Sequence, residues 1–130
     1  YDVWQQDGLQ MLIDPMRTSA HKVGKYDYAV GEDAGKHRVR CYLSADGSIQ
    51  LGDITTWKVA TRRGENGNIT YEIAIPWSAI LPFQPATGAN LGFTLILNED
   101  DGFGRDSFMT WFGNAHNKDI DKVGDLILVD

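Results

Sequence analysis

Apolar and polar side chains alternate over short stretches of this chain, whereas the three- and four-residue spacing of amphipathic helices is scarce. In the stretch 68–76, for example, positions 69, 71, 73 and 75 are all apolar or aromatic, and Thr70 and Glu72 lie between them. A period of two predicts a strand that buries one face and exposes the other. The pattern therefore predicts a protein built from strands.

About eight segments follow this pattern, at 9–14, 26–30, 38–43, 54–62, 68–76, 91–98, 108–112 and 126–129. Turn-forming pairs that end in Gly separate several of them, at 46–47, 87–88 and 101–102. This spacing predicts an all-β fold, an antiparallel β-sandwich of jelly-roll or immunoglobulin-like type. The segment 76–82 departs from the alternation. Pro76 stands at its start and Pro82 at its end, and this placement of prolines predicts a short helical turn between two strands.

Length and charge limit the function classes. A chain of 130 residues predicts a single domain spanning 1–130. The formal net charge of −6 argues against nucleic acid as a partner, because phosphate contacts need a basic surface. No run approaches the roughly 20 apolar residues of a membrane helix, so no membrane partner is expected. The polar first residues show no signal peptide, which fits a mature or trimmed chain, or a cytosolic one.

The sequence contains no phrase typical of a catalytic site. It has no Gly-x-Ser-x-Gly turn, no phosphate-binding loop and no cluster of Cys and His at zinc spacing. Cys41 is the only cysteine, and its place in an alternating run predicts a buried, inert thiol. Glycoside hydrolysis needs two positioned carboxylates, and no acidic pair stands in a recognisable catalytic phrase. We therefore expect a protein that is not an enzyme.

Four phrases give the chain a family resemblance. They are Val-Trp-Gln-Gln-Asp-Gly-Leu-Gln-Met-Leu-Ile-Asp at 3–14, Tyr-Glu-Ile-Ala-Ile-Pro-Trp at 71–77, the stretch 91–101 that ends in Asn-Glu-Asp-Asp, and Val-Gly-Asp-Leu-Ile-Leu at 123–128. In this order the chain resembles the family 9 carbohydrate-binding modules. The resemblance implies a non-catalytic, sugar-binding β-sandwich that is extracellular or on the cell surface. Such modules are attached to polysaccharide-degrading enzymes, and oligo- or polysaccharide is the partner it implies.

The resemblance also implies the residues of a sugar site. Trp4 lies where these modules carry a tryptophan that stacks on sugar rings, and Gln10 lies where relatives carry a glutamate. The second clamping tryptophan of the family has no counterpart, and its stretch offers Asn114, His116 and Asn117 instead. Trp111 aligns with a family tryptophan that belongs to the core. The alternative for Trp4 is an indole packed at the edge of the sandwich.

Calcium is the cofactor that the acidic segments suggest. Calcium binds six to eight oxygen ligands, and glycines allow a loop to wrap around it. The stretch 98–106 holds four carboxylates and an amide, although not at EF-hand spacing. The candidate structural ligands are Asp7, Asn98, Asp100, Asp101 and Asp106. The alternative is a solvated acidic turn with Arg105 as its counter-ion.

Family members usually open with further strands that precede the region of resemblance. A sandwich without them exposes sheet edges, which invite pairing with another strand. The sequence therefore predicts self-association or a second chain that supplies the missing strands. A structural or protein-interaction module that has lost the sugar clamp is the alternative function.

Overall fold

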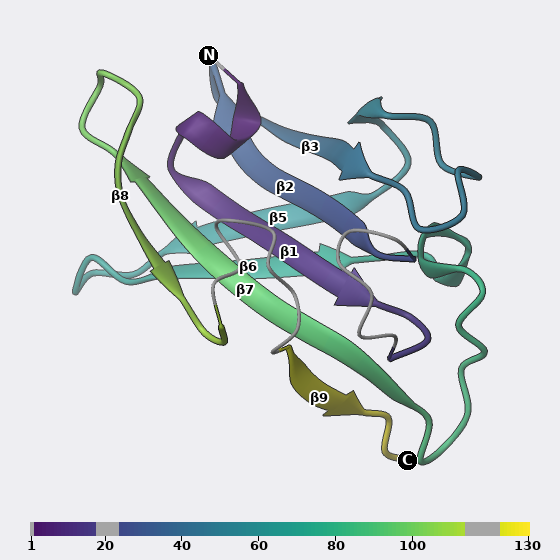
Figure 1. The fold of residues 1–130 in the computed structure, drawn as a ribbon. Helices are drawn as coiled ribbons and strands as arrows, with labels where there is room; N and C mark the ends of the chain where they lie inside the picture. Colours follow the sequence, from purple (N-terminus) through teal and green to yellow (C-terminus); the bar gives the residue numbers. More distant parts are fainter. Residues whose placement is uncertain (1, 18–23, 114–122) are drawn as a thin grey trace.

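The strands of this protein pair in two antiparallel sheets of unequal size (Figure 1). The structure is a computed structural model that describes residues 2–17, 24–113 and 123–130. Within these residues the elements are η1 (Val3–Gln5), β1 (Gly8–Asp14), β2 (Tyr26–Asp33), β3 (Lys36–Leu43), β4 (Gly52–Ile54), β5 (Lys58–Arg63), β6 (Ile69–Ala74), η2 (Trp77–Ile80), β7 (Asn90–Asp100), β8 (Arg105–Thr110) and β9 (Gly124–Ile127). Both η elements are short 3₁₀ turns.

The larger sheet has seven strands in the order β4-β3-β2-β1-β7-β8, and β9 pairs with the first residues of β7. The smaller sheet contains β5 and β6 alone among the described residues, and it crosses behind the larger sheet in Figure 1. We call the face of the larger sheet towards β5 and β6 its inner face, and the opposite face its outer face. The predicted all-β antiparallel sandwich is confirmed, as is the short turn within 76–82.

The predicted strand at 54–62 is wrong in one respect. The segment contains the end of β4 and most of β5, which belong to different sheets. Between them the chain crosses from the larger to the smaller sheet, and the side chain of Trp57 is buried, with 8% of its surface exposed. Trp57 is in phase with Val59 of β5 but not with Ile54 of β4, and the pattern shifts by one residue at the crossing without a turn residue to mark it.

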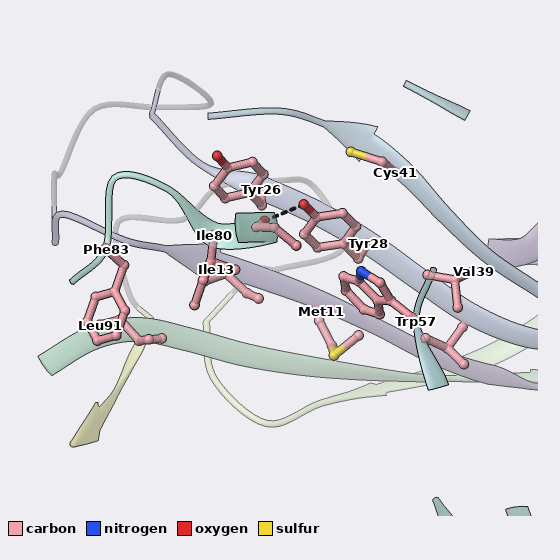
Figure 2. Close-up of a cluster of buried hydrophobic side chains, with 12 residues drawn as sticks. Met11, Ile13, Tyr26, Tyr28, Val39, Cys41, Trp57, Ile80, Phe83 and Leu91 are labelled. Carbon is pink, nitrogen blue, oxygen red and sulfur yellow. Dashed lines mark hydrogen bonds between the residues drawn. The ribbon is translucent and has the colours of Figure 1, made fainter. Parts of the chain in front are cut away.

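The core lies between the inner face and the smaller sheet. Figure 2 shows Tyr26, Tyr28 and Trp57 next to one another in its centre. The rings of Tyr26 and Tyr28 are stacked with their centroids 5.6 Å apart, and the Trp57 ring lies 4.7 Å from that of Tyr28. These large aromatic side chains fill the space between the layers, where burial of their surface stabilises the fold.

Both tyrosine hydroxyls bond across the end of the sandwich. Tyr28 Oη donates to the carbonyl of Ala79 at 2.5 Å, and Tyr26 Oη donates to the carbonyl of Leu81 at 2.7 Å. A buried hydroxyl without a partner is costly, so these bonds determine where the chain after β6 returns to the core. They hold η2 and the following residues against β2.

Burial of these groups predicts loss of stability at alkaline pH. Burial raises the pKa of Tyr26 from 10.0 to about 12 and, together with the nearby Asp27, that of Cys41 from 9.0 to about 11. The folded state thus holds these protons more tightly than the unfolded state does. Their contribution to stability is complete below the unfolded pKa values and is lost as the pH rises through the folded ones. We expect the free energy of unfolding to fall between about pH 9 and 12.

Urea denaturation at successive pH values measures this effect. Replacing Tyr26 by phenylalanine removes one of the titrating groups, so the variant is expected to show a shallower fall over the upper part of the same window. A free energy of unfolding that stays level throughout the window would contradict the prediction.

Candidate functional site

The outer face of the larger sheet buries an unusual number of polar side chains. All seven residues of β1 are buried, so the strand is covered on both faces. On its outer side Leu12 and Ile96 form a small apolar cluster, and buried polar residues surround them, namely Gln10, Asp14, Lys25, Asp27, Thr94 and Asn98. Buried polar groups need hydrogen-bond partners, so the polar side chains of this face are expected to be held in fixed positions.

Trp4 stands on a small, well-fixed support at one end of this face. Asp2 caps η1 by accepting the N–H of Val3 at 3.1 Å, and the side chain of Gln5 accepts the N–H of Asp2 at 3.1 Å. Tyr42 Oη, from β3, donates to the same carboxylate at 2.6 Å. This hydrogen bond is the main cause that lowers the pKa of Asp2, and Arg40 contributes in the same direction. The turn that carries Trp4 is thus held by its own cap and by β3.

A glycine in β2 lets η1 lie close to the sheet. A Cβ atom at Gly31 would lie 3.2 Å from Val3 Cγ1. The side chain of Val3 is therefore able to pack on bare backbone, and only 1% of its surface is exposed. Gly8 of β1 is paired with Gly31, and a Cβ atom there would lie 2.3 Å from the carbonyl oxygen of Val30, so Gly8 is needed for the close pairing of β1 with β2.

The indole of Trp4 is half-buried and lies against a guanidinium group. Arg105 Cζ lies 4.8 Å from the centroid of the Trp4 ring and 4.8 Å from that of Phe108, so the cation is in contact with both aromatic rings. Arg105 Nη1 also donates to Asn98 Oδ1 at 3.2 Å. A planar cation over an aromatic face is attractive. An aromatic plane, a guanidinium and an amide thus meet at one end of the outer face.

Gln10 lies deeper in the same face. Its amide nitrogen donates to both oxygens of Asp27, at 2.9 Å and 3.2 Å, and only 6% of the residue is exposed. The resemblance predicts a sugar contact for this residue. In the structure its nitrogen is engaged with Asp27, so this nitrogen is not a free donor for a ligand. Asn114, His116 and Asn117 lie outside the described residues.

Sequence reasoning missed two members of this site. Arg105 was expected as the counter-ion of an acidic turn, and Phe108 was assigned no role. Both come to Trp4 because β7 and β8 form a hairpin in which Phe108 pairs with Asn98. The Asp101-Gly102 turn was the available signal, since a hairpin around it brings the start of β8 back beside the end of β7.

The candidate calcium ligands lie near the same hairpin, but they bind the backbone. Asp7 Oδ1 accepts the N–H of Asp100 at 2.9 Å, and Asp100 Oδ1 accepts the N–H groups of Gly102 and Gly104 at 2.7 and 2.8 Å. Asp106 Oδ2 accepts the N–H of Asp101 at 3.2 Å. These bonds tie the loop to itself and to Asp7, which lies between η1 and β1.

In this arrangement the candidate ligands Asp7, Asn98, Asp100 and Asp106 are engaged in hydrogen bonds. Asn98 Oδ1 accepts from the Arg105 guanidinium, and a second cation beside it would be repelled. Across the part of the chain that the structure describes, no group of three or more His, Cys, Asp or Glu side chains is placed to hold a metal ion. Calcium stays a prediction from the sequence, and no further step is derived from it.

A second recess opens between the two sheets, and Asp7 is one of the residues that line it. It has a volume of about 420 Å³ and its lining includes Glu32, His37, Thr61 and Tyr71. His37 Nε2 lies 3.1 Å from Thr61 Oγ1, which joins the two sheets across the recess. Neither Trp4 nor Gln10 lines this recess.

Fold and site together define a β-sandwich binding module, in which a fixed aromatic ring is presented beside polar side chains. Comparison with known families identifies which one: residues 1–130 match the family described as Carbohydrate family 9 binding domain-like, and the chain belongs to that family. The predicted resemblance is confirmed. The family supports carbohydrate binding as the general function and a saccharide as the partner.

Searches of the curated proteins and of the solved structures each returned no match. Among the described residues, no helix has the length and apolar character needed to cross a membrane.

Proposed function

We propose that this protein binds carbohydrate at the outer-face end of its larger sheet, with Trp4 as the stacking platform. The observation that supports the proposal is the fixed, half-buried indole of Trp4 beside the polar groups of Arg105 and Asn98. Sugar rings present flat patches of C–H groups, and a rigid indole offers a matching apolar plane at small entropic cost. Hydroxyl groups at the rim of the sugar need hydrogen-bond partners at the same place.

Arg105 is suited to supply such partners. A guanidinium has five N–H donors in a fixed plane. Among the described residues, Arg105 donates a side-chain hydrogen bond to Asn98, and its other N–H groups can serve sugar hydroxyls. It also covers part of the Trp4 ring, so a sugar either stacks on the remaining surface or displaces it. We include Gln10, Asn114, His116 and Asn117 as further hydroxyl partners, as the family resemblance implies.

The proposed role is non-catalytic. The module would hold substrate for a secreted or surface-bound polysaccharide-processing protein, in agreement with the non-catalytic role that the family suggests. One aromatic platform and a few exposed hydrogen bonds correspond to a roughly micromolar to millimolar dissociation constant, or about −8 to −4 kcal/mol. Affinity in this range suits a module that must release and rebind a polymer.

A thermal melt with a panel of mono- and oligosaccharides tests the proposal. A ligand that binds only the folded state raises the midpoint by mass action, and ten times its dissociation constant contributes about 1.4 kcal/mol. For a domain of this size the expected rise is roughly 4 to 7 °C. Sorbitol at equal concentration is the control, because polyols stabilise proteins without a specific site. If no sugar exceeds sorbitol, the proposal is wrong.

The same melt with calcium and with a chelator tests the sequence-based metal prediction separately. A calcium site in the 98–106 loop requires a higher midpoint with calcium than with chelator. Equal melting midpoints with calcium and with chelator would contradict the calcium prediction, and they would agree with a loop whose carboxylates bind backbone N–H groups instead.

A further inference from the structure

The aromatic rings at the proposed sugar site hold a positive charge. Arg105 Cζ lies 4.8 Å from the centroid of the Trp4 ring and 4.8 Å from that of the Phe108 ring. The face of an aromatic ring attracts cations, because its π electrons make it the negative part of the ring. Asn98 Oδ1 accepts from the same guanidinium at 3.2 Å, and only 7% of Asn98 is exposed. We call the position of this guanidinium the cation position.

The hairpin around the cation position is strongly acidic. Arg105 is the only basic residue in the stretch 98–110, and five carboxylates belong to this stretch or bond to it, namely Asp7, Glu99, Asp100, Asp101 and Asp106. Within the described residues none of the five forms an ion pair. Four of them accept hydrogen bonds from backbone N–H groups or from a serine hydroxyl instead. Their charges are therefore not neutralised there, and an acidic surface of this kind attracts cationic ligands.

The guanidinium that fills the cation position is held by contacts that a ligand can replace. Arg105 forms no ion pair with any residue that the structure describes, and its contacts are the two rings and Asn98. Contacts of a cation with partly exposed rings are weak. Two cations at the same position repel each other, so a positive group of a ligand would replace the guanidinium rather than join it.

We propose that the saccharide bound at this site is an amino sugar, and that its protonated amine takes the cation position. The inference rests on the proposed function, because it specifies the class of sugar that the same site binds. An ammonium group has three N–H donors, one of which can reach Asn98 Oδ1 in place of the guanidinium. The C–H groups of the sugar ring remain available to stack on Trp4.

The other sugar classes fit this site less well. A neutral sugar has no charge with which to replace the guanidinium against the two rings. A sugar with a carboxylate or sulfate group would approach five carboxylates that are not neutralised within the described residues, and like charges repel. A basic peptide would have the right charge, but the family of this chain supports a saccharide as the partner.

Three oligosaccharides of equal length and linkage test the inference. They are β-1,4-linked glucose oligomers that carry at C2 a free amine, an acetylated amine or a hydroxyl group. Isothermal titration of the whole chain is expected to show about tenfold tighter binding of the free amine than of the other two. If the acetylated or the hydroxyl oligomer binds as tightly as the amine, the inference is wrong and the proposed function stands. If none of the three binds and no other sugar does, the proposed function fails as well.

Replacing Arg105 tests whether the amine takes the place of the guanidinium. Arg105→Met removes the charge and keeps an apolar side chain, so the amine oligomer is expected to bind about threefold more tightly or better once its competitor is gone. The hydroxyl oligomer should not gain in the same way. Arg62→Met is the matched control, since Arg62 is exposed on β5 in the smaller sheet, and it should leave both affinities unchanged. Weaker binding of the amine oligomer by Arg105→Met overturns the inference, because Arg105 would then contact the ligand.

Two further measurements separate a sugar site from general attraction of cations. Phe108→Leu removes one ring of the cation position, and it is expected to weaken binding of the amine oligomer about threefold with little change for the hydroxyl oligomer. A lysine oligomer of equal charge is expected to bind about tenfold more weakly than the amine oligomer, because it lacks sugar rings to stack on Trp4. Equal affinity for the lysine oligomer, or no effect of Phe108→Leu, overturns the inference in favour of unspecific attraction to the acidic hairpin.

Discussion

Replacing Trp4 by alanine is expected to abolish measurable carbohydrate binding while the fold is retained. The substitution removes the apolar plane, and a loss of at least tenfold, about 1.4 kcal/mol, takes an already weak ligand beyond detection. The two cap hydrogen bonds of η1, from Val3 N–H to Asp2 and from Asp2 N–H to Gln5, do not use the indole, and Trp4 is the smallest of the influences that lower the pKa of Asp2, so the turn should persist. Isothermal titration with the sugar that gives the largest melting shift measures the loss.

Trp77→Ala is the matched control for this experiment. Trp77 is also a partly exposed tryptophan, at 48%, but it lies in η2 and packs against Phe83. Its variant should bind sugar as the parent chain does. Undiminished affinity in Trp4→Ala would remove Trp4 from the site and direct attention to the recess near Tyr71.

Replacing Trp57 by alanine is expected to produce the largest loss of stability. This side chain fills the space between the two sheets against the ring of Tyr28, and truncating a buried tryptophan costs about 3–5 kcal/mol. A loss of this size is a large part of the total stability of a small domain. Urea denaturation measures it, with Trp77→Ala expected to lose clearly less.

The position of Trp57 makes the expected loss local as well as global. It immediately precedes β5, so its removal should weaken the attachment of the smaller sheet first, and amides of β5 and β6 should exchange faster than those of β1. Equal changes in exchange in both sheets would contradict this account of Trp57, even if the total loss is as large as expected.

The sequence predicted the strands well because most of them bury one face. Alternation is a local signal, and it identified every strand of the larger sheet to within a few residues, apart from the short β4. It did not separate β4 from β5, because apolar residues occur on both sides of the crossing, at Ile54 and Trp57, and no Gly or Pro lies between them. Membership of a sheet depends on pairing between distant residues, which a local pattern does not contain.

The exposure of Trp111 could not be predicted from alternation for a related reason. The sequence placed this residue in the core, but it lies directly after β8 and 58% of its surface is exposed. Positions 93, 95 and 97 alternate as a core strand does, and Trp111 follows the same rule. The pattern identifies which face is apolar, but it does not identify how much of that face a second layer covers.

The candidate site was predicted in part. Family resemblance indicated Trp4, whose support by Asp2 and Tyr42 joins residues 40 positions apart. A still larger separation in sequence hid the contact of Arg105 with Trp4. Gln10 was expected to face a ligand, and its bond to Asp27 could not be foreseen because it depends on the register between β1 and β2.

The four tryptophans lie in four separate environments, and this distribution gives the protein built-in optical probes. Trp57 is buried between the sheets, Trp4 contacts a cation, Trp77 packs against Phe83 and Trp111 is largely exposed. In variants that retain one indole each, the fluorescence of Trp57 reports separation of the sheets and that of Trp4 reports displacement of Arg105. Sugar binding and unfolding can then be followed as distinct signals in one molecule.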